Sequence, residues 1–260
     1  MFHRLQESIY ERLRHAYRVR ALDRLLLEQR IDGPWLGSHE LLQTLLSVKA
    51  ILPSVPPILV DVGAHRGAFS RGAQQILGFD RIICVEPDES LLAEVAKAVP
   101  ADRSSIHHLA LTHFDGEADL FVHPDQTMNS LVEASKEVLR QEFNTYPSDQ
   151  IRSQAVKAAT LDSFLADIDL DREAEIFLKL DTQGNELDIL RGGRMSLRRV
   201  SACLLEFMFC TPYATSYSFS ELVGFMAEAG FECRGVLDVT RKRTHRISAV
   251  DFLFVKKAPC

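Results

Sequence analysis

An apolar run that ends in an acidic, glycine-containing turn constrains the fold of this chain more than any other feature. Residues 58–60 are apolar, Asp61 follows them, and glycines stand at positions 63 and 67. Glycine can adopt positive φ and lets the backbone approach a ligand, because it has no Cβ. A strand, a glycine turn and a helix in succession form the nucleotide-binding crevice of open α/β sheets. The segment therefore predicts a ligand site at the end of a buried strand.

The spacing of this turn narrows the class of ligand. The chain has neither the Gly-x-Gly-x-x-Gly nor the Gly-Lys-Ser/Thr pattern that seats phosphates at such a turn. A turn that opens with a carboxylate suits a cationic, amine-bearing ligand better, and S-adenosylmethionine is such a ligand. A generic strand-to-helix turn is the alternative interpretation. On the first interpretation, the cofactor contacts are Asp61, Gly63, Ala64, His65 and Gly67.

A second acidic residue ends the next apolar run. Residues 82–86 predict a buried strand, and Pro87 prevents the simple continuation of its ladder. A carboxylate at this position, Glu86, can accept hydrogen bonds from both ribose hydroxyls of an adenosyl group. Dinucleotide enzymes use the same geometry, so a nicotinamide-dependent oxidoreductase is an alternative that the missing third glycine opposes. A helix-capping acid is the structural alternative for Glu86.

Five segments in order resemble the FkbM family of S-adenosylmethionine-dependent methyltransferases. The likeness runs from about residue 55 to the C-terminus. It departs from the family at His65, where the family commonly carries Asn, and residues 1–50 match no pattern that we can name. The segments are Asp61–Ser70, Val85–Pro87, Thr160–Leu165, Phe177–Glu186 and Leu204–Phe207.

The resemblance implies a fold and a reaction. The fold is an α/β class I methyltransferase (Rossmann-like) fold, with a seven-stranded, mostly parallel sheet and an antiparallel C-terminal hairpin. The reaction is methylation of a hydroxyl on a sugar, a glycolipid or a secondary metabolite, with S-adenosylmethionine as donor and S-adenosylhomocysteine as product. A non-catalytic adaptor that retains the fold and binds a partner through a basic N-terminal helix is the alternative from another class.

The apolar pattern along the chain predicts the same architecture. Alternating strands and helices favour βαβ units and a mainly parallel sheet. The last two strands are joined by residues 241–246, which are too few for a crossover helix, so that pair is expected to be antiparallel. Strands are predicted at 58–62, 82–86, 105–110, 175–181, 201–207, 231–239 and 247–255, and helices near 39–52, 69–77, 88–98, 184–192 and 218–229.

Two carboxylates at predicted strand ends are the candidate catalytic residues. Asp181 ends the fourth strand of the sheet and Glu206 the fifth. Methyl transfer from a sulfonium needs alignment and, for an oxygen acceptor, a general base. We expect Asp181 next to the methyl group and cofactor, and Glu206 on the substrate side. Glu186 is a third candidate on the substrate side, or only an acid at a helix N-terminus. Two carboxylates are insufficient evidence for a divalent cation, so no metal site is predicted.

Other contacts follow from position and resemblance. Ala110 and Leu111 follow the third strand and are expected beside the adenine. The segment 123–131 resembles a Ser-Leu loop of the family, so Ser130 is expected at the cofactor and Asn129 at the substrate. Polar, irregular residues 124–150 predict an insertion that forms a lid.

The first 54 residues predict a helical segment attached to a methyltransferase domain at 55–260. Residues 3–30 have the spacing of an amphipathic helix, and residues 1–30 carry seven Arg against four acids. This segment is a candidate substrate lid, partner interface or peripheral membrane contact, with a solvated face of a docked helix as the alternative. Trp35, the only tryptophan, either covers a ligand or packs in the core.

Composition excludes several classes. A net charge of −6 argues against a nucleic-acid-binding protein, and 46% hydrophobic residues support a full core. The five cysteines form no paired or metal-binding framework, which suits a reducing compartment. No apolar stretch is long enough to span a membrane, and no signal peptide is visible. A cytoplasmic protein with a small-molecule or glycan substrate is therefore expected, while the oligomeric state stays open.

Overall fold

The computed structural model covers the predicted core of the chain. It describes residues 37–52, 54–135, 139, 150–171, 173–209, 213, 217–241 and 246–257. The predicted amphipathic helix at 3–30, Trp35 and most of the second half of the predicted lid therefore lie outside the described residues. Among the described residues, no helix is long and apolar enough to cross a membrane.

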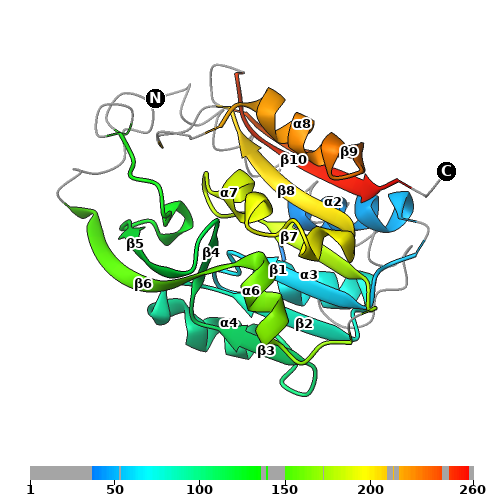
Figure 1. The fold of residues 1–260 in the computed structure, drawn as a ribbon, viewed down its shortest axis with the longest axis horizontal. Coiled ribbons are helices and arrows are strands. Elements are labelled where there is room, and N and C mark those ends of the chain that lie inside the picture. The colour runs from blue at the N-terminus through cyan, green and yellow to red at the C-terminus, as the bar shows by residue number, and fades with distance from the viewer. Residues whose placement is uncertain are drawn as a thin grey trace, which may run out of the picture.

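A seven-stranded sheet forms the centre of the molecule (Figure 1). Its order is β3-β2-β1-β7-β8-β10-β9, with parallel pairing from β3 to β8 and antiparallel pairing of β10 with both neighbours. This is the topology of the class I methyltransferase fold, so the predicted fold class is confirmed. The strands are β1 (Ile58–Val62), β2 (Arg81–Val85), β3 (Ser104–His107), β7 (Ile176–Leu180), β8 (Val200–Met208), β9 (Phe231–Arg241) and β10 (Ile247–Lys256).

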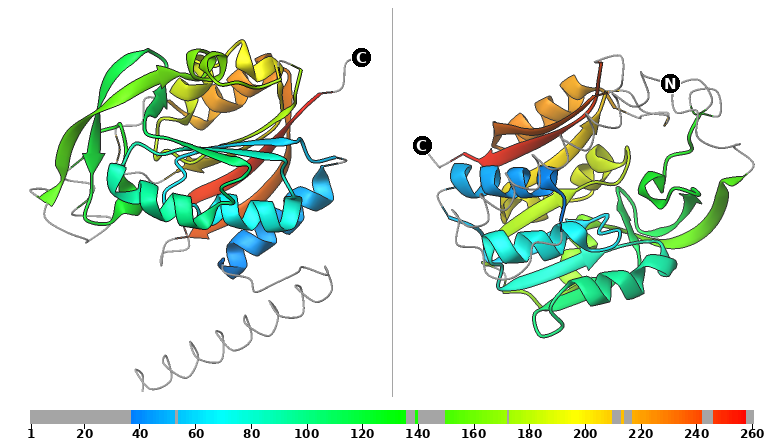
Figure 2. Two further views of the ribbon diagram at one scale, coloured as in Figure 1. Left: turned by 90° about the horizontal axis from the view of Figure 1, so that it is seen from below. Right: turned by 180° about the vertical axis from the view of Figure 1, so that it is seen from behind.

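Helices cover both faces of this sheet (Figures 1 and 2). Residues of α2, α3 and α4 share one core cluster with the sheet, and residues of α6, α7 and α8 share the other. Short 3₁₀ turns lie beside some of the helices. The helices predicted near 39–52, 69–77, 88–98, 184–192 and 218–229 are present, and one further helix, α6, was not predicted. The helices are α2 (His39–Ile51), α3 (Ala68–Leu77), α4 (Leu92–Ala98), α6 (Leu161–Asp167), α7 (Glu186–Arg191) and α8 (Phe219–Glu228), with η1 (Glu89–Leu91), η2 (Gln126–Met128) and η5 (Ser196–Arg198).

The central strands are buried because both faces are covered. On β1, Val60 and Val62 contribute to the cluster under α6–α8, while Leu59 contributes to the cluster under α2 and α3. Strand alternation places Asp61 on the same face as Leu59, where it is fully buried. Helix α2 also buries Leu42 in that cluster, although the predicted domain division at residue 54 itself remains a prediction.

A second, three-stranded sheet was not predicted. Its order is β4-β6-β5, from β4 (Ala110–Thr112), β5 (Gly116–Val122) and β6 (Arg152–Thr160). The predicted strand at 105–110 is therefore wrong in extent, because β3 ends at His107 and β4 belongs to the other sheet. Side chains of β5 and β6 are largely exposed, so these strands lack the apolar pattern that marked the main sheet.

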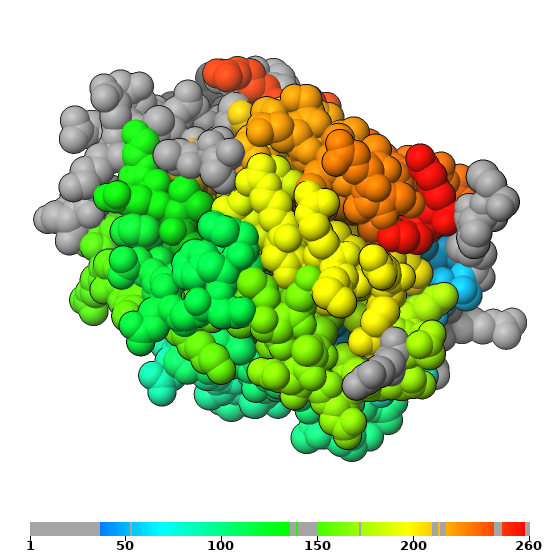
Figure 3. Space-filling model, in the orientation of Figure 1, coloured from blue at the N-terminus to red at the C-terminus, as the bar shows by residue number. Residues whose placement is uncertain are grey.

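The small sheet packs directly against the main body. Strand β4 contacts α7. In the space-filling view, the green surface of the region that contains the small sheet adjoins the yellow surface of the region that contains α7 (Figure 3). Asn185 connects the two sheets, because its Nδ2 donates a hydrogen bond to the Leu111 carbonyl at 2.7 Å. This contact places β4 beside the carboxyl ends of β1 and β2, where the ligand site was predicted.

Gly63, in the turn after β1, lies very close to the backbone of the turn after β7. It adopts a φ of +75°, and a Cβ at this position would lie 2.0 Å from the carbonyl oxygen of Asp181. Gly63 thus lets the turns after β1 and β7 touch. Gly78, at the end of α3, has the same φ of +75°, but a Cβ there would meet no atom within 4 Å.

This pair of glycines separates steric clash from backbone strain. Gly78→Ala should cost about 1 kcal/mol of unfolding free energy, the typical strain of a left-handed residue. Gly63→Ala carries that strain and a backbone clash, so it should cost about 3 kcal/mol or more. Urea unfolding of both variants measures the difference. Equal costs would show that the β1 and β7 turns can separate without penalty.

Candidate functional site

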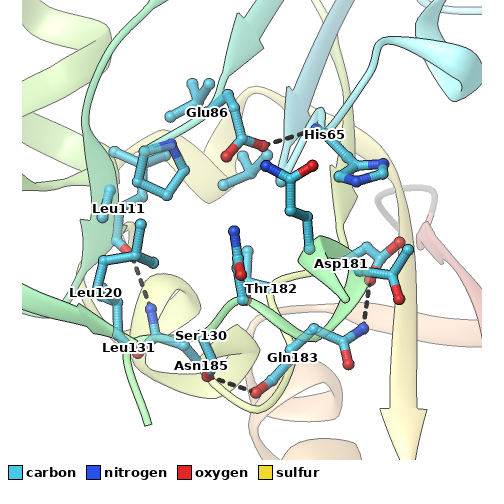
Figure 4. Close-up of a pocket in the computed structure, with 18 of the residues that line it drawn as sticks. His65, Glu86, Leu111, Leu120, Ser130, Leu131, Asp181, Thr182, Gln183 and Asn185 are labelled. Atoms are coloured by element: carbon cyan, nitrogen blue, oxygen red, sulfur yellow. Dashed lines mark hydrogen bonds between the residues drawn. The ribbon is translucent and has the colours of Figure 1, made fainter. Parts of the chain in front are cut away.

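A pocket with an empty volume of about 840 Å³ opens at the carboxyl ends of β1, β2 and β7 (Figure 4). Its walls come from the turns after these strands, from β4 and β5, and from the η2 loop. The lining residues are Val62, Gly63, His65, Val85, Glu86, Pro87, Leu109, Ala110, Leu111, Leu120, Gln126, Thr127, Asn129, Ser130, Leu131, Asp181, Thr182, Gln183, Asn185 and Glu206.

One end of the pocket is apolar. Ala110 and Leu111 line it together with Leu109, Leu120 and Leu131. The structure thus brings Ala110 and Leu111 to the pocket wall, and their contact with adenine stays a prediction. Leu120 lies on β5, where no strand was predicted from the sequence, so this residue was not among the expected contacts. This end offers a dry surface for a planar apolar group.

Glu86 stands in the middle of the pocket. It is 4% exposed, and its Oε2 accepts a hydrogen bond from the His65 amide at 2.7 Å. Its Oε1 accepts one from the Asp88 amide at 2.9 Å. Burial raises the pKa of Glu86 to about 7, against the effect of these two donors. The carboxylate is held rigidly and each oxygen retains a lone pair for a ligand hydroxyl.

The other end of the pocket is polar. Gln183 donates through Nε2 to Asp181 Oδ1 and to Glu206 Oε2, each at 3.1 Å. It adopts a φ of +59°, an unusual backbone for a residue with a side chain. The carboxyl groups of Asp181 and Glu206, the two predicted catalytic residues, therefore lie side by side. The side-chain amide of Gln183 connects them, and in the sequence this residue stood out only as part of the segment Phe177–Glu186.

Glu206 is electrostatically unusual. Burial raises its pKa to about 9, with further contributions from the carboxylates of Asp181, Asp251 and Glu186. Burial and Asp181 also raise the pKa of Asp251 to about 7. At neutral pH, Glu206 carries a proton, and its carboxyl can donate a hydrogen bond as well as accept one.

Asp61 does not line the pocket. Its Oδ1 lies 3.1 Å from Lys179 Nζ, and its Oδ2 accepts a 2.6 Å hydrogen bond from the Ser70 hydroxyl. Lys179 also approaches Asp181 Oδ2 at 3.5 Å and donates to the Gly63 carbonyl at 3.0 Å. Burial opposes the charge on Lys179, but Asp61 and Asp181 outweigh it and raise its pKa. The expected meeting of Asp61 with a cationic ligand is replaced by this internal ion pair.

Glu186 also turns inward. It is 2% exposed, and its carboxylate accepts hydrogen bonds from the Thr182 and Gly184 amides at 2.9 and 3.2 Å, from the Thr182 hydroxyl, and from the Tyr217 hydroxyl. It is absent from the pocket wall. The expected contact of Glu186 with the substrate is therefore replaced by a structural role. Glu186 holds the turn between β7 and α7 that presents Asp181.

The η2 loop closes one side of the pocket. Ser130 donates to the Gln183 carbonyl at 2.8 Å, and Asn129 donates to Asp88 at 2.9 Å. Both lie on the pocket wall, as does Pro87. Gly67 caps α3 at a φ of +73°, where a Cβ would meet Ala98 at 2.7 Å, so it serves helix packing. Ala64 is buried outside this pocket.

The described residues include no group of three or more His, Cys, Asp or Glu arranged to hold a metal ion.

The Lys179–Asp61 pair generates a test. Lys179→Met leaves a buried carboxylate without its cation, which should cost about 3–5 kcal/mol of unfolding free energy. Adding Asp61→Asn removes the orphaned charge, so the double variant should recover part of that loss. Urea unfolding of the two single variants and the double variant completes the cycle. Additive losses would show that the two side chains do not depend on each other.

Glu206 predicts a pH dependence of stability. Folding raises the pKa of Glu206 from 4.5 to about 9. Between these pH values the unfolded chain gives up this proton more readily than the folded protein, so the free energy of unfolding decreases as pH increases. Glu206→Gln cannot ionise, so its stability relative to the wild type should increase from pH 5 to pH 9, by up to about 1.4 kcal/mol for each pH unit. Thermal unfolding at both pH values is the measurement. A constant difference would contradict the raised pKa.

The sequence of this chain matches a known methyltransferase family and a curated relative. The methyltransferase FkbM domain model matches residues 61–233. A curated relative, the 2-O-methyltransferase NoeI of Sinorhizobium fredii (strain NBRC 101917 / NGR234), is 25% identical over 198 residues, which is 74% of each chain.

Solved structures are similar at a lower level. A putative S-adenosylmethionine-dependent methyltransferase from Listeria monocytogenes has 8% identity and a TM-score of 0.47, covering 83% of this chain and 99% of its own. M. capricolum TrmK in complex with S-adenosylhomocysteine has 9% identity and a TM-score of 0.46, covering 82% and 67%. Because the family model matches more than half of the chain, this protein belongs to the FkbM methyltransferase family.

Proposed function

We propose that this protein transfers a methyl group from S-adenosylmethionine to a hydroxyl of a small-molecule or glycan acceptor, such as a sugar, a glycolipid or a secondary metabolite. One observation carries the proposal. A single pocket at the carboxyl ends of β1, β2 and β7 has an apolar end, a buried carboxylate in its middle and a carboxyl pair at its polar end. That order matches the parts of an adenosyl sulfonium.

The residues present fit this cofactor. Leu109, Leu111 and Leu120 offer apolar surface for the adenine ring. Glu86 faces the pocket with lone pairs suited to two ribose hydroxyls. Asp181 lies at the end where a positive sulfonium and amino group favour a carboxylate. When bound, the cofactor supplies a methyl group on a positively charged sulfur.

Asp181 is the candidate for contact with the acceptor hydroxyl. Its side chain is 43% exposed, and Gln183 and Lys179 hold it from two sides. A carboxylate so placed can orient the hydroxyl and accept its proton as the oxygen attacks the methyl group. The protonated Glu206 beside it can donate a hydrogen bond to a second oxygen of the acceptor. Alignment of the two reactants supplies much of the rate in such a displacement.

The oxygen acceptor has support from a relative. The name of NoeI describes a 2-O-methyltransferase, and its alignment spans 74% of this chain. A hydroxyl is a poor nucleophile until its proton is removed, so an oxygen acceptor requires a base of the kind that Asp181 provides.

Calorimetry and turnover assays test the two halves of the proposal. At pH 8, where a carboxyl with a pKa of about 7 is mostly ionised, Glu86→Gln should weaken S-adenosylhomocysteine binding at least 10-fold, because the ribose hydroxyls lose an ionised acceptor worth roughly 1.5 kcal/mol or more. Its matched control is Glu89→Gln, at an exposed position of η1, which should bind normally. Asp181→Asn should retain most of the affinity and lose methyl transfer to hydroxylated acceptors by about 100-fold or more.

Unchanged binding by Glu86→Gln would remove this pocket as the adenosyl site. Full turnover by Asp181→Asn would exclude it as the base.

A further inference from the structure

A second pocket adjoins the first on the α2 side of the sheet. Its empty volume is about 870 Å³. It lies between the start of α2, the first turn of α3 and the ends of β8, β9 and β10. The residues that characterise it are Glu40, Phe69, Asp181, Glu206, Asp238 and Asp251. Pairing in the sheet explains part of this set, because Asp251 on β10 stands opposite Glu206 on β8.

The two pockets share a wall. Gly63, His65, Asp181 and Glu206 line both of them. These residues are at the polar end of the first pocket, where the proposed function places the reactive methyl group. A molecule in the second pocket therefore reaches the reaction centre from the side opposite the apolar end. Phe69 adds an aromatic surface to this entrance.

The second pocket is strongly acidic. Five carboxyl groups line it, at positions 40, 181, 206, 238 and 251. Besides His65, whose pKa is lowered by burial and by Arg66, the cation in the described wall is Lys179. Lys179 is committed to the Asp61 and Asp181 carboxylates, 3.1 and 3.5 Å away. The carboxyls of Asp238 and Asp251 are left without a described cation within ion-pair distance.

The negative charge of the second pocket favours some methyl acceptors over others. Crowded carboxylates repel a phosphate, sulfate or carboxylate group, and the repulsion increases in a partly desolvated site. Burial and neighbouring carboxylates raise the pKa of Asp251 to about 7. A raised pKa is expected of a buried acid that lacks a counter-charge. An ammonium group entering the pocket would supply that counter-charge. The described carboxyls are not grouped as metal ligands.

We propose that the second pocket binds the methyl acceptor, and that the acceptor is a hydroxylated molecule carrying a positively charged amine, of the amino-sugar type. The proposal rests on the proposed methyltransferase function. In it, Asp238 and Asp251 bind the amine and Phe69 packs against the carbon skeleton. Asp181 contacts the hydroxyl that receives the methyl group, and Glu206 contacts a second oxygen of the acceptor.

Three oligosaccharides of similar size and different charge test the proposal. Kanamycin carries amines, maltotriose is neutral, and trigalacturonate is anionic. Each is titrated by calorimetry into the full chain saturated with S-adenosylhomocysteine. Kanamycin should bind at least 10-fold more tightly than maltotriose, and trigalacturonate should not bind. Asp251→Asn should reduce the kanamycin affinity at least 10-fold without changing the affinity for S-adenosylhomocysteine.

A matched control is Asp80→Asn, which removes an exposed carboxylate from the turn before β2, at the opposite end of the sheet. It should leave kanamycin binding unchanged. Equal effects of Asp80→Asn and Asp251→Asn would show a general charge effect and overturn the proposal. Absence of kanamycin binding, or tighter binding of maltotriose or trigalacturonate, would overturn it as well.

Metal binding and cofactor binding complete the test. Mg²⁺ or Ca²⁺ binding that Asp251→Asn abolishes would replace the amine with a divalent cation and overturn the proposal. If wild-type protein fails to bind S-adenosylhomocysteine at all, the proposed function itself fails. If it binds S-adenosylhomocysteine but not kanamycin, the function stands and the acceptor assignment is wrong.

Discussion

The buried pair of Lys179 and Asp61 is the interaction on which the rest of the site depends. A charge on a central strand is costly to bury, and the pair is tolerable because each partner meets the other's charge and further hydrogen bonds satisfy the remaining atoms. Lys179 reaches from β7 to the Gly63 carbonyl after β1 and to Asp181 at its own strand end. One ammonium group thus connects both turns that form the polar end of the pocket.

The turns beyond these strands repeat the same principle. Glu86 holds the amides of His65 and Asp88, and Glu186 holds the amides of Thr182 and Gly184. Each buried carboxylate organises a loop by accepting its N–H groups, which otherwise would lack partners. Two of the carboxyls left over, Asp181 and Glu206, face the pockets. Glu86 combines both roles, because it accepts hydrogen bonds from two loop amides and also lines the first pocket.

The excess of acids at this edge has a cost and a use. Glu206 and Asp251 are neighbours across the β8–β10 ladder, and burial together with the charge of Asp181 raises the pKa of both. Such crowding reduces stability at alkaline pH. It also leaves a region that favours a cation, which is the basis for assigning an amine-bearing acceptor to the second pocket. Perturbed carboxyls grouped at a cleft are a common mark of functional sites.

Much of the first pocket could be predicted from the sequence. The run from 58 to 67 and the acid at Glu86 indicated the crevice, because a strand, a glycine turn and a terminal carboxylate are local features. The role of Asp61 could not be predicted, since Lys179, which neutralises it, is distant in the chain. For Glu186 a structural role was one of two alternatives, and its local donors Thr182 and Gly184 favour that one. An acid beside a glycine turn has the same sequence pattern whether it faces a ligand or a lysine.

Local patterns in the sequence indicated the seven strands of the main sheet, most of the helices, the family and the carboxylates at strand ends, because apolar periodicity and turn residues act over short distances. Only the tertiary structure decided which carboxylates are neutralised and which face a cavity. It also decided that the exposed strands β5 and β6 form a second sheet that supplies the apolar wall through Leu120. Their pairing depends on contacts across the chain, and their side chains carry little apolar pattern to reveal it.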